Sequence, residues 1–315
     1  MVNKNYWDLA KRPHTKLKLE IYKKYLKSWC TIFKRQKWAK EIFIVDCFAG
    51  RGNYDLESEK GVLDGSPLIT VKIAKEFQDK FNAQKQKSKE QFRIKCIFIE
   101  KSKNNINYLN NLLKPYLSDV DIEIIEGDFN NVIKNIVKNI GNKPALFFVD
   151  PFGIKTLKKE SVQSIVSKKG AKDILLNYIQ EGVERIEGLA KKRLKECKEF
   201  SVKEIKTIKN LYDFMGHLEC IGKNEKAILN MYVEEVLKGN NVNVGDNDKL
   251  DVIAFGMPYP HKRDIIYYLL FASRNKSAIK IVRNVYASCK KTNFNDQQSL
   301  FDTNQLSKLH NEFNI

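Results

Sequence analysis

The sequence lacks the long apolar segments that membrane-spanning and secreted proteins carry. Nowhere in its 315 residues does an apolar run approach the roughly 20 residues needed to span a bilayer. The N-terminal segment MVNKNYWDLAKRPHTK is polar and contains no apolar core of a signal peptide. We therefore expect a cytoplasmic protein with no membrane partner.

Cysteine is scattered, which argues against a metal centre. The six cysteines form no C-x-x-C pair, and the four histidines are not close to them in the sequence. Zinc and iron–sulfur sites need such clusters, and large cytosolic proteins rarely use disulfides. We therefore expect no metal site. Two cysteines in strand-like runs, Cys47 and Cys96, are expected to be small core residues.

Acidic residues are too few to balance the basic ones. The chain has 56 lysines and arginines against 38 aspartates and glutamates, which gives a net charge of +18. Such a surplus favours a polyanionic partner, and nucleic acid, either DNA or RNA, is the commonest one. The alternative is a solvated basic surface that binds nothing.

Two basic groups are candidates for phosphate contacts. Residues 1–40 hold 12 lysines and arginines against two acidic residues, and a second group begins near residue 185. A solvated helix face is the alternative for each group. The residues that we expect to contact nucleic acid are Lys16, Arg51, Arg185, Lys191, Lys192 and Arg193.

Strand-like and helical segments alternate through the first half of the chain. Apolar residues recur at helical spacing over 15–36, where lysines such as Lys18 fill the gaps, and Ser66-Pro67 is a typical helix start. Strands that alternate with helices predict a parallel sheet. The expected strands are 41–47, 94–99, 122–125, 145–149 and 174–178; the expected helices between them are 66–81, 102–117, 129–140 and 157–169, with 53–65 as a polar loop.

The pattern changes after residue 180. Residues 182–240 are expected to be helical, and two strands at 252–257 and 267–272 follow, joined by a turn short enough for an antiparallel hairpin. A reversed strand at the end of a parallel sheet is typical of S-adenosylmethionine-dependent methyltransferases. We therefore predict an α/β, Rossmann-like class I methyltransferase fold, with a mostly parallel seven-stranded sheet, a terminal antiparallel hairpin and a helical insertion. The expected division is a core over 1–181, the insertion over 182–248, a hairpin and helix over 249–291 and a flexible tail over 292–315.

The residues after the first strand predict a cofactor site. Ligands of open α/β sheets bind beyond the carboxyl ends of the strands. The glycines of the D-C-F-A-G-R-G segment allow a close backbone approach, whereas the G-x-G-x-x-G and Walker patterns of phosphate-binding loops are absent. S-adenosylmethionine carries no phosphate, and Asp46 is placed to accept a hydrogen bond from its amino group. We expect Phe48, Ala49, Gly50 and Gly52 to line the same pocket.

Two further carboxylates follow the next strands. Glu100 ends the second strand and is placed to accept hydrogen bonds from the ribose hydroxyls of S-adenosylmethionine. Asp128, followed by Phe129, comes after the third strand and is placed to bind the adenine amino group. Alone, each signal is weak, because a G-x-G loop is often only a turn and an aspartate after a strand is often a helix cap. The alternative to this cofactor is a decayed pocket or one for another nucleotide.

Several motifs together make the chain resemble a known family. They are His14-Thr15-Lys16-Leu17, the loop 46–52 with Gly65-Ser66-Pro67, Phe148–Gly153, and the apolar segment Tyr267–Ser273. With these motifs the whole chain resembles the three-Cys-motif partner protein (TcmP) family. The resemblance implies a methyltransferase-like fold, a bacterial or mobile-element context and a protein partner encoded nearby. The three-cysteine motif belongs to that partner, which fits the absence of a cysteine cluster here.

The tetrapeptide after the fourth strand is the candidate for catalysis. Amino-directed nucleic-acid methyltransferases use [D/N]-P-P-[Y/F/W], whereas this chain has Asp150-Pro151-Phe152-Gly153, so the aromatic residue comes one place early. The tetrapeptide looks more like that of tRNA guanine-N2 dimethyltransferases. We expect Asp150 to accept a hydrogen bond from a base amino group, with Pro151 and Phe152 near the base. The alternative is that Asp150-Pro151 only turns the chain.

The sequence leaves rival functions open. Gln297–Phe301 (QQSLF) matches the pattern by which bacterial proteins bind the replication sliding clamp, although such short motifs also arise by chance. A non-catalytic or partner-dependent subunit that keeps the fold for binding is the first alternative, because the loop 53–65 separates the glycines from the next helix. A nuclease is the second, but no clustered Asp/Glu/Lys metal site is evident.

Overall fold

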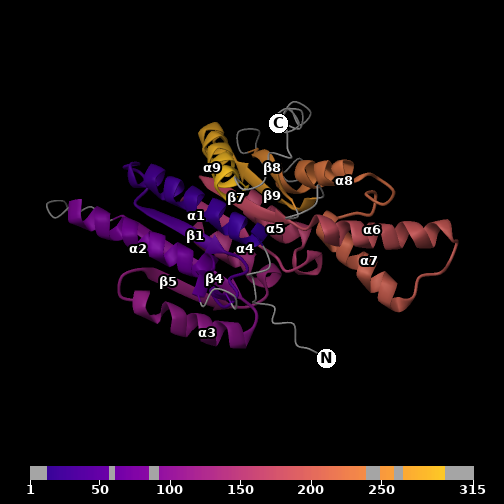
Figure 1. Ribbon diagram of the computed structural model, residues 1–315, viewed down its shortest axis with the longest axis horizontal. Coiled ribbons are helices and arrows are strands. Elements are labelled where there is room, and N and C mark those ends of the chain that lie inside the picture. Colours follow the sequence, from indigo (N-terminus) through magenta and orange to yellow (C-terminus); the bar gives the residue numbers. More distant parts are fainter. Residues whose placement is uncertain (1–12, 57–60, 85–91, 239–248, 259–264, 295–315) are drawn as a thin grey trace.

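The computed structural model describes residues 13–56, 61–84, 92–238, 249–258 and 265–294 (Figure 1). One seven-stranded sheet forms the centre of the molecule, in the order β5-β4-β1-β6-β7-β9-β8. Strand β9 runs antiparallel to both of its neighbours, and the other pairings are parallel. The strands are β1 (Glu41–Asp46), β4 (Arg93–Glu100), β5 (Asp121–Glu126), β6 (Ala145–Val149), β7 (Lys172–Tyr178), β8 (Asp251–Pro258) and β9 (Ile265–Ser273).

This strand order and the reversed β9 are those of the class I methyltransferase fold, so the predicted fold is confirmed. The chain runs from β1 outward to β4 and β5, and then returns to β6 on the other side of β1. The switch in strand order therefore lies between β1 and β6. Ligands of open α/β sheets bind at such a switch point, beyond the carboxyl ends of the strands.

Side chains alternate between the two faces of the sheet, as the pleat of a strand requires. Ile44 and Phe98 belong to one buried cluster, whereas their strand neighbours Val45 and Ile97 belong to the other. Because both faces are buried, the parallel strands read as nearly continuous apolar runs. Helices α1 (Pro13–Lys34), α2 (Ser66–Gln84), α3 (Lys103–Leu113) and α9 (Lys276–Phe294) contribute to the first cluster, and α4 (Phe129–Ile140) and α5 (Lys159–Val166) to the second.

Helices fill the segment between β7 and β8. They are α6 (Gln180–Lys195), α7 (Val202–Met215), α8 (Glu225–Tyr232) and the π-helical turn η3 (Val233–Leu237). Figure 1 shows α6 and α7 projecting from the body of the molecule. The other end of this segment packs into the second cluster, where Phe214 of α7 stacks on Tyr232 of α8 with ring centroids 4.5 Å apart.

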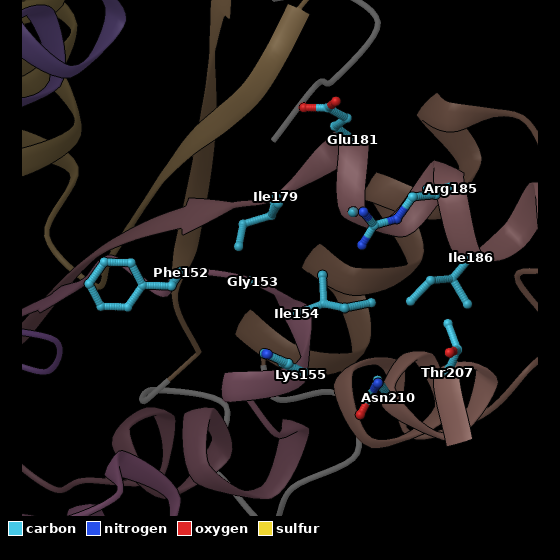
Figure 2. A pocket seen from close by; sticks show the side chains of 11 residues that line it. Phe152, Gly153, Ile154, Lys155, Ile179, Glu181, Arg185, Ile186, Thr207 and Asn210 are labelled. Atoms are coloured by element: carbon cyan, nitrogen blue, oxygen red, sulfur yellow. The ribbon is translucent and has the colours of Figure 1, made fainter. Parts of the chain in front are cut away.

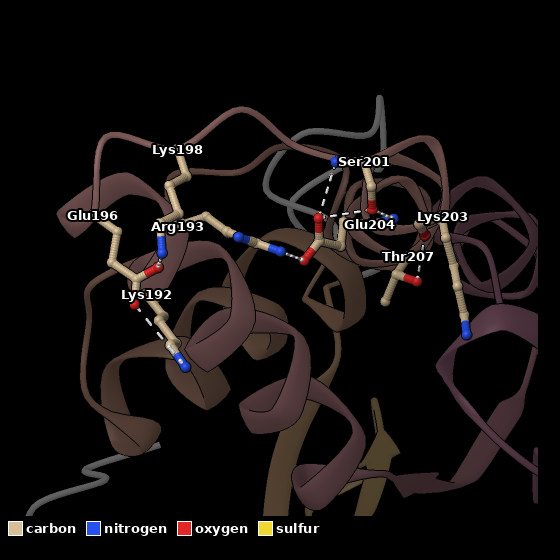
Figure 3. Close-up of polar contacts among 8 residues, drawn as sticks. All are labelled: Lys192, Arg193, Glu196, Lys198, Ser201, Lys203, Glu204 and Thr207. Atoms are coloured by element: carbon tan, nitrogen blue, oxygen red, sulfur yellow. Dashed lines mark hydrogen bonds and ion pairs between the residues drawn. The ribbon is translucent and has the colours of Figure 1, made fainter.

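A polar clasp joins α6 to α7 at the projecting end (Figure 3). The Arg193 guanidinium donates to Glu204 Oε1 at 2.8 and 2.7 Å, and Ser201 caps α7 by accepting from the Glu204 amide. The Ser201 hydroxyl and amide donate to Glu204 Oε2 at 2.7 and 2.9 Å, and these hydrogen bonds, followed by those from Arg193, lower the pKa of Glu204 to about 2. Arg193 therefore holds the helix pair together, whatever else it contacts.

The prediction of a loop over 53–65 is wrong. Strands β2 (Asn53–Leu56) and β3 (Gly61–Asp64) form an antiparallel hairpin there. The Gly65 amide donates to the Gly52 carbonyl at 2.9 Å, so the residues before and after the hairpin are adjacent. Strands of four residues with charged members show no clear alternation of apolar and polar residues, which is why the pattern missed them. The helix start at Ser66 is therefore beside the glycines, although it is distant in sequence.

The expectation that two strand cysteines are core residues is confirmed. Both Cys47 and Cys96 are buried in the core. Among the described helices none is long and apolar enough to cross a membrane. Helix α9 continues to Phe294, into the segment expected as a tail, and the clamp-like motif at Gln297–Phe301 lies outside the described residues.

Candidate functional site at the carboxyl edge of the sheet

Polar side chains gather where the parallel strands end. Asp46 and Glu100 are the last residues of β1 and β4, Asp128 follows β5, Asp150 follows β6, and Asn177 is the penultimate residue of β7. Because these strands are parallel and adjacent, their carboxyl ends form a single edge. Asp46 and Asp150 flank the switch point.

Asp46 is fully buried and only partly satisfied. Its Oδ1 accepts from the Phe48 amide at 3.2 Å, whereas its Oδ2 makes no hydrogen bond to any described residue. Burial raises the pKa of Asp46 from 3.8 to about 7, the nearby Ser66 hydroxyl and the Phe48 amide oppose the rise, and the charges of Asp150 and Glu100 add to it. A buried acceptor without a partner carries a substantial cost, which a ligand donor would relieve.

The glycine loop after β1 is tightly braced. Gly50 and Gly52 have φ values of 63° and 91°, in the region that favours glycine. The Gly50 amide donates to Glu100 Oε2 at 2.8 Å, and the Ala49 amide donates to the Ile99 carbonyl at 2.9 Å. The loop is therefore fixed to the end of β4, as close backbone approach to a ligand demands.

Glu100 is the brace for this loop and is itself nearly saturated. In addition to the Gly50 amide, it accepts from the Ser102 amide at 2.7 Å and from Asn105 Nδ2 at 3.3 Å. An ionised carboxylate has about four acceptor positions, so one remains. The expected contact of Glu100 with ribose hydroxyls stays a prediction, and it would have to use that last position or displace a donor.

Asp128 serves as the cap of α4. Its Oδ1 accepts from the backbone amide and the side-chain amide of Asn130, both at 3.0 Å, and its Oδ2 pairs with Lys101 at 2.9 Å. This is the helix-cap arrangement that the sequence left open. Phe129 is buried and lies against Phe48, with ring centroids 5.1 Å apart. The two aromatic rings thus line the end of β1 from the second face of the sheet.

Asp150 lies in a polar cluster that the sequence did not reveal. Lys18 Nζ of α1 contacts Asp150 Oδ2 at 2.5 Å, and Asn177 Nδ2 donates to Asp150 Oδ1 at 2.8 Å. The Lys18 side chain is only 8% exposed, and Nζ also lies 5.6 Å from the centre of the Tyr267 ring. Asn177 Oδ1 is buried and makes no hydrogen bond to the described residues.

Lys18 lies on the buried face of α1, although the sequence pattern placed it in a gap between the apolar residues. At 3.6 residues per turn, Lys18 shares a helix face with Tyr22, Tyr25 and Trp29, which are all buried. A lysine on an apolar helix face needs a buried partner, so this periodicity was the available signal. Nothing in the local sequence pointed to Asn177 except a polar residue near the end of an apolar strand.

Phe152, two residues after Asp150, lies at one end of a pocket of about 460 Å³ (Figure 2). Pro151 is buried and Phe152 is half exposed, so the turn directs its aromatic ring outward. The residues that line the pocket come from the loop and turn after β6, from α6 and the residue before it, and from α7: Phe152, Gly153, Ile154, Lys155, Ile179, Glu181, Gly182, Arg185, Ile186, Thr207 and Asn210.

The expected nucleic-acid residues do not form one cluster. Arg51 lies in the glycine loop, where its Nε donates to the Asn53 carbonyl and its guanidinium lies 5.3 Å from the centre of the Tyr108 ring. Lys16 is in α1. Arg185 lines the pocket, whereas Lys191 and Lys192 are exposed near the end of α6 with Arg193 in the clasp described above. Within the described ranges, no group of three or more His, Cys, Asp or Glu side chains is arranged to hold a metal ion.

Comparisons with known proteins find similar solved structures at low sequence identity. No family model and no curated protein sequence matches the chain. A Legionella pneumophila protein assigned to family model DUF519 is similar in structure, with 12% identity, a TM-score of 0.46, and 91% of this chain and 93% of that chain covered.

Two further solved structures, an rRNA methylase and a pre-rRNA processing protein, are also similar. An rRNA methylase from Streptococcus thermophilus has 12% identity and a TM-score of 0.32, with 74% of this chain and 87% of that chain covered. A fibrillarin pre-rRNA processing protein from Methanococcus jannaschii has 11% identity and a TM-score of 0.37, with 85% and 76% covered. The TM-scores of these three structures are all below 0.5. The fold is therefore identified from the order and direction of the strands in the sheet.

Replacing Asp46 should change how stability depends on pH. A carboxyl with a pKa near 7 in the folded chain and 3.8 in the unfolded chain binds its proton more tightly when folded. The free energy of unfolding should therefore fall as pH rises from about 4 to about 7, by up to roughly 4 kcal/mol, and level off above. Asp46→Asn should lack this component. Urea unfolding of both proteins at about pH 5 and about pH 8 measures it; equal losses in the two proteins would contradict the burial of a titrating Asp46.

Removing Lys18 should destabilise the protein strongly. Lys18→Met leaves the Asp150 charge largely buried without its cation, which costs about 3 kcal/mol or more. Lys24→Met is the matched control on the same helix, since Lys24 forms a more exposed pair with Glu20 and should contribute less than about 1 kcal/mol. Urea unfolding compares the two variants, and similar losses would refute a buried Lys18–Asp150 pair.

Proposed function

We propose that the chain is an S-adenosylmethionine-dependent methyltransferase that acts on nucleic acid. The observation that carries the proposal is Asp46, a buried carboxylate with an unpartnered oxygen beside a two-glycine loop at the switch point of the sheet. An amino group is the donor that this oxygen lacks, and the absence of phosphate on the cofactor suits a loop without a phosphate-binding pattern. The neighbouring residues fit the same ligand.

In this proposal the cofactor extends along the edge from β1 to β5. Asp46 binds its amino group, Glu100 its ribose hydroxyls and Asp128 its adenine amino group. The loop residues Phe48, Ala49, Gly50 and Gly52, together with Phe129, line the pocket. When bound, S-adenosylmethionine supplies a methyl group on a positively charged sulfur. Asp46 and Glu100 add negative charge close to that cation.

Asp150 and Asn177 position the target in the same proposal. A base amino group that approaches the switch point can donate to Asp150, which has acceptor positions left beyond Lys18 and Asn177, and to the unpartnered Asn177 Oδ1. Pro151 fixes the turn, and Phe152 packs near the base.

The net charge of +18 supports nucleic acid as the substrate. Lys16, Arg51, Arg185, Lys191, Lys192 and Arg193 are the proposed phosphate contacts. Arg193 is already engaged by Glu204, so within this set we expect the smallest contribution from it.

A second candidate is a partner-dependent subunit that keeps the fold for binding. Two observations favour it: Lys18 already contacts Asp150, and three donors already occupy Glu100. A neighbouring protein that moved α1 would free Asp150. Kinship with the three-Cys-motif partner proteins, and hence a role in bacterial defence or a mobile element, belongs to this proposal, as does sliding-clamp binding through Gln297–Phe301.

Cofactor binding is the first test. Calorimetric titration of S-adenosylmethionine should show micromolar binding to the wild type, and Glu100→Ala should weaken it by at least about 100-fold because both a ligand contact and the loop brace are lost. Glu126→Ala is the control, since this glutamate is directly opposite Glu100 on β5 but exposed. Unchanged binding in Glu100→Ala would refute the assigned pocket.

Methyl transfer is the second test. Wild-type protein with radiolabelled cofactor should label bacterial tRNA, ribosomal RNA or DNA, and Asp150→Asn should reduce the rate by about 100-fold or more while cofactor affinity is kept. Glu126→Ala is again the control. Tight cofactor binding with no labelling of any nucleic acid would contradict a self-sufficient enzyme and favour the partner-dependent subunit.

A further inference from the structure

The pocket beyond Phe152 has the features of a nucleotide site. Its floor is apolar, with Ile154, Ile179 and Ile186, and Phe152 lies at one end, 50% exposed and with its ring turned away from these isoleucines (Figure 2). An exposed aromatic ring beside an apolar floor offers a stacking surface for a planar base. The volume of about 460 Å³ is large enough for one nucleotide.

The charges around this pocket favour an anion. Figure 2 shows Arg185 reaching from α6 over the pocket and Lys155 on the opposite side, toward Phe152. Both are exposed, and neither forms an ion pair with another described residue. Glu181 is the single carboxylate among the described lining residues. Two cations against one carboxylate suit a phosphate, and Glu181 and Asn210 can hydrogen-bond the edge of a base.

The pocket adjoins the proposed transfer site and shares Phe152 with it. Phe152 follows Asp150 by two residues, but Asp150 and its partners Lys18 and Asn177 do not line the pocket. The remaining walls come from α6 and α7, the helices that project from the sheet. A polynucleotide with one nucleotide in the pocket would therefore present a neighbouring nucleotide to Asp150.

We infer that this pocket binds one unpaired nucleotide that flanks the target in a single-stranded or locally opened polynucleotide. The inference rests on the proposed function, because it names the substrate class of that site. The base stacks on Phe152, and Arg185 and Lys155 bind the phosphates on its two sides. The helices α6 and α7 thereby contribute substrate selection to the methyltransferase fold.

A substitution at Gly153 fills the pocket without distorting the chain. Gly153 has φ of 174°, which any residue adopts, and a Cβ there would meet no atom within 4 Å. Gly153→Leu should therefore fold normally and occupy the space for the base. Gly188→Leu is the matched control, because Gly188 is exposed on α6, also has open space at its Cβ and does not line the pocket.

Fluorescence anisotropy with labelled oligonucleotides tests the inference. The probes are single-stranded RNA and DNA of about 12 nucleotides, their duplexes, and a single strand of the same length without bases. Wild type and Gly188→Leu should bind the single strands at least about tenfold more tightly than the duplexes and the abasic strand. Gly153→Leu should lose about tenfold in affinity for the single strands and little for the abasic strand.

Three outcomes would overturn the inference. The first is that Gly153→Leu binds single strands as tightly as the wild type, and the second is that the wild type prefers duplexes. The third is that an acidic peptide competes with the oligonucleotide for the wild type equally well and no longer binds Gly153→Leu. The last would make the pocket a peptide site. Calorimetric titration of S-adenosylmethionine into the same proteins separates the two proposals. If one of these three outcomes is found but the wild type still binds cofactor and labels nucleic acid, the proposed methyltransferase function is retained and only the nucleotide pocket is refuted. If the wild type binds no cofactor, the methyltransferase proposal is refuted, whatever the oligonucleotides show.

Discussion

The ion pair between Lys18 and Asp150 ties the N-terminal helix to the carboxyl edge of the sheet. Both side chains are largely buried, so each would be costly alone, and together they keep α1 over the end of β6. The same helix stacks Tyr22 on Phe148 at 4.3 Å and hydrogen-bonds Tyr25 to Asp173 of β7 at 2.6 Å. Helix α1 is therefore part of the site as well as part of the core.

The second constraint is the braced glycine loop. Glu100 holds the Gly50 amide, and the hairpin β2–β3 closes where Gly65 meets Gly52, with no space for a side chain at 65 because a Cβ there would lie 2.7 Å from the Gly52 carbonyl oxygen. These contacts fix the loop before any ligand arrives. Preorganised loops of this kind spend little binding free energy on ordering. Asp46 remains beside the loop with its buried Oδ2 unpartnered.

The layout of strands and helices was predictable because both faces of the sheet are buried. Continuous apolar runs such as Ala145–Val149 leave little doubt about a strand, and the helix over Phe129–Ile140 was predicted to the residue. The hairpin β2–β3 was missed because its short strands carry charges and are stabilised by a contact between two distant glycines. Predicting that contact requires the fold.

The site was predictable only in part, for the same reason. Carboxylates at strand ends follow from the fold, so the positions of Asp46, Glu100 and Asp150 were anticipated. Their partners were not, since Lys18 and Asn177 meet Asp150 from sequence separations of 132 and 27 residues. For Asp128 the sequence pattern is ambiguous. An aspartate that caps a helix and an aspartate that contacts a ligand are both found directly after a strand, and in the structure Asp128 caps α4. The pocket that contains Phe152, Lys155 and Arg185 was not predictable, because its lining residues come from three separate segments, 152–155, 179–186 and 207–210.

Hydrogen–deuterium exchange with and without S-adenosylmethionine tests most directly whether the carboxyl edge is a cofactor site. Bound cofactor should slow amide exchange in peptides that contain the glycine loop 46–53 and the segment 100–105, where amides are held by Glu100. Peptides from α7 should exchange as before, because no proposed cofactor contact lies there. Protection confined to α6 and α7, or no protection anywhere at saturating cofactor, would contradict a cofactor site at the carboxyl edge of the sheet.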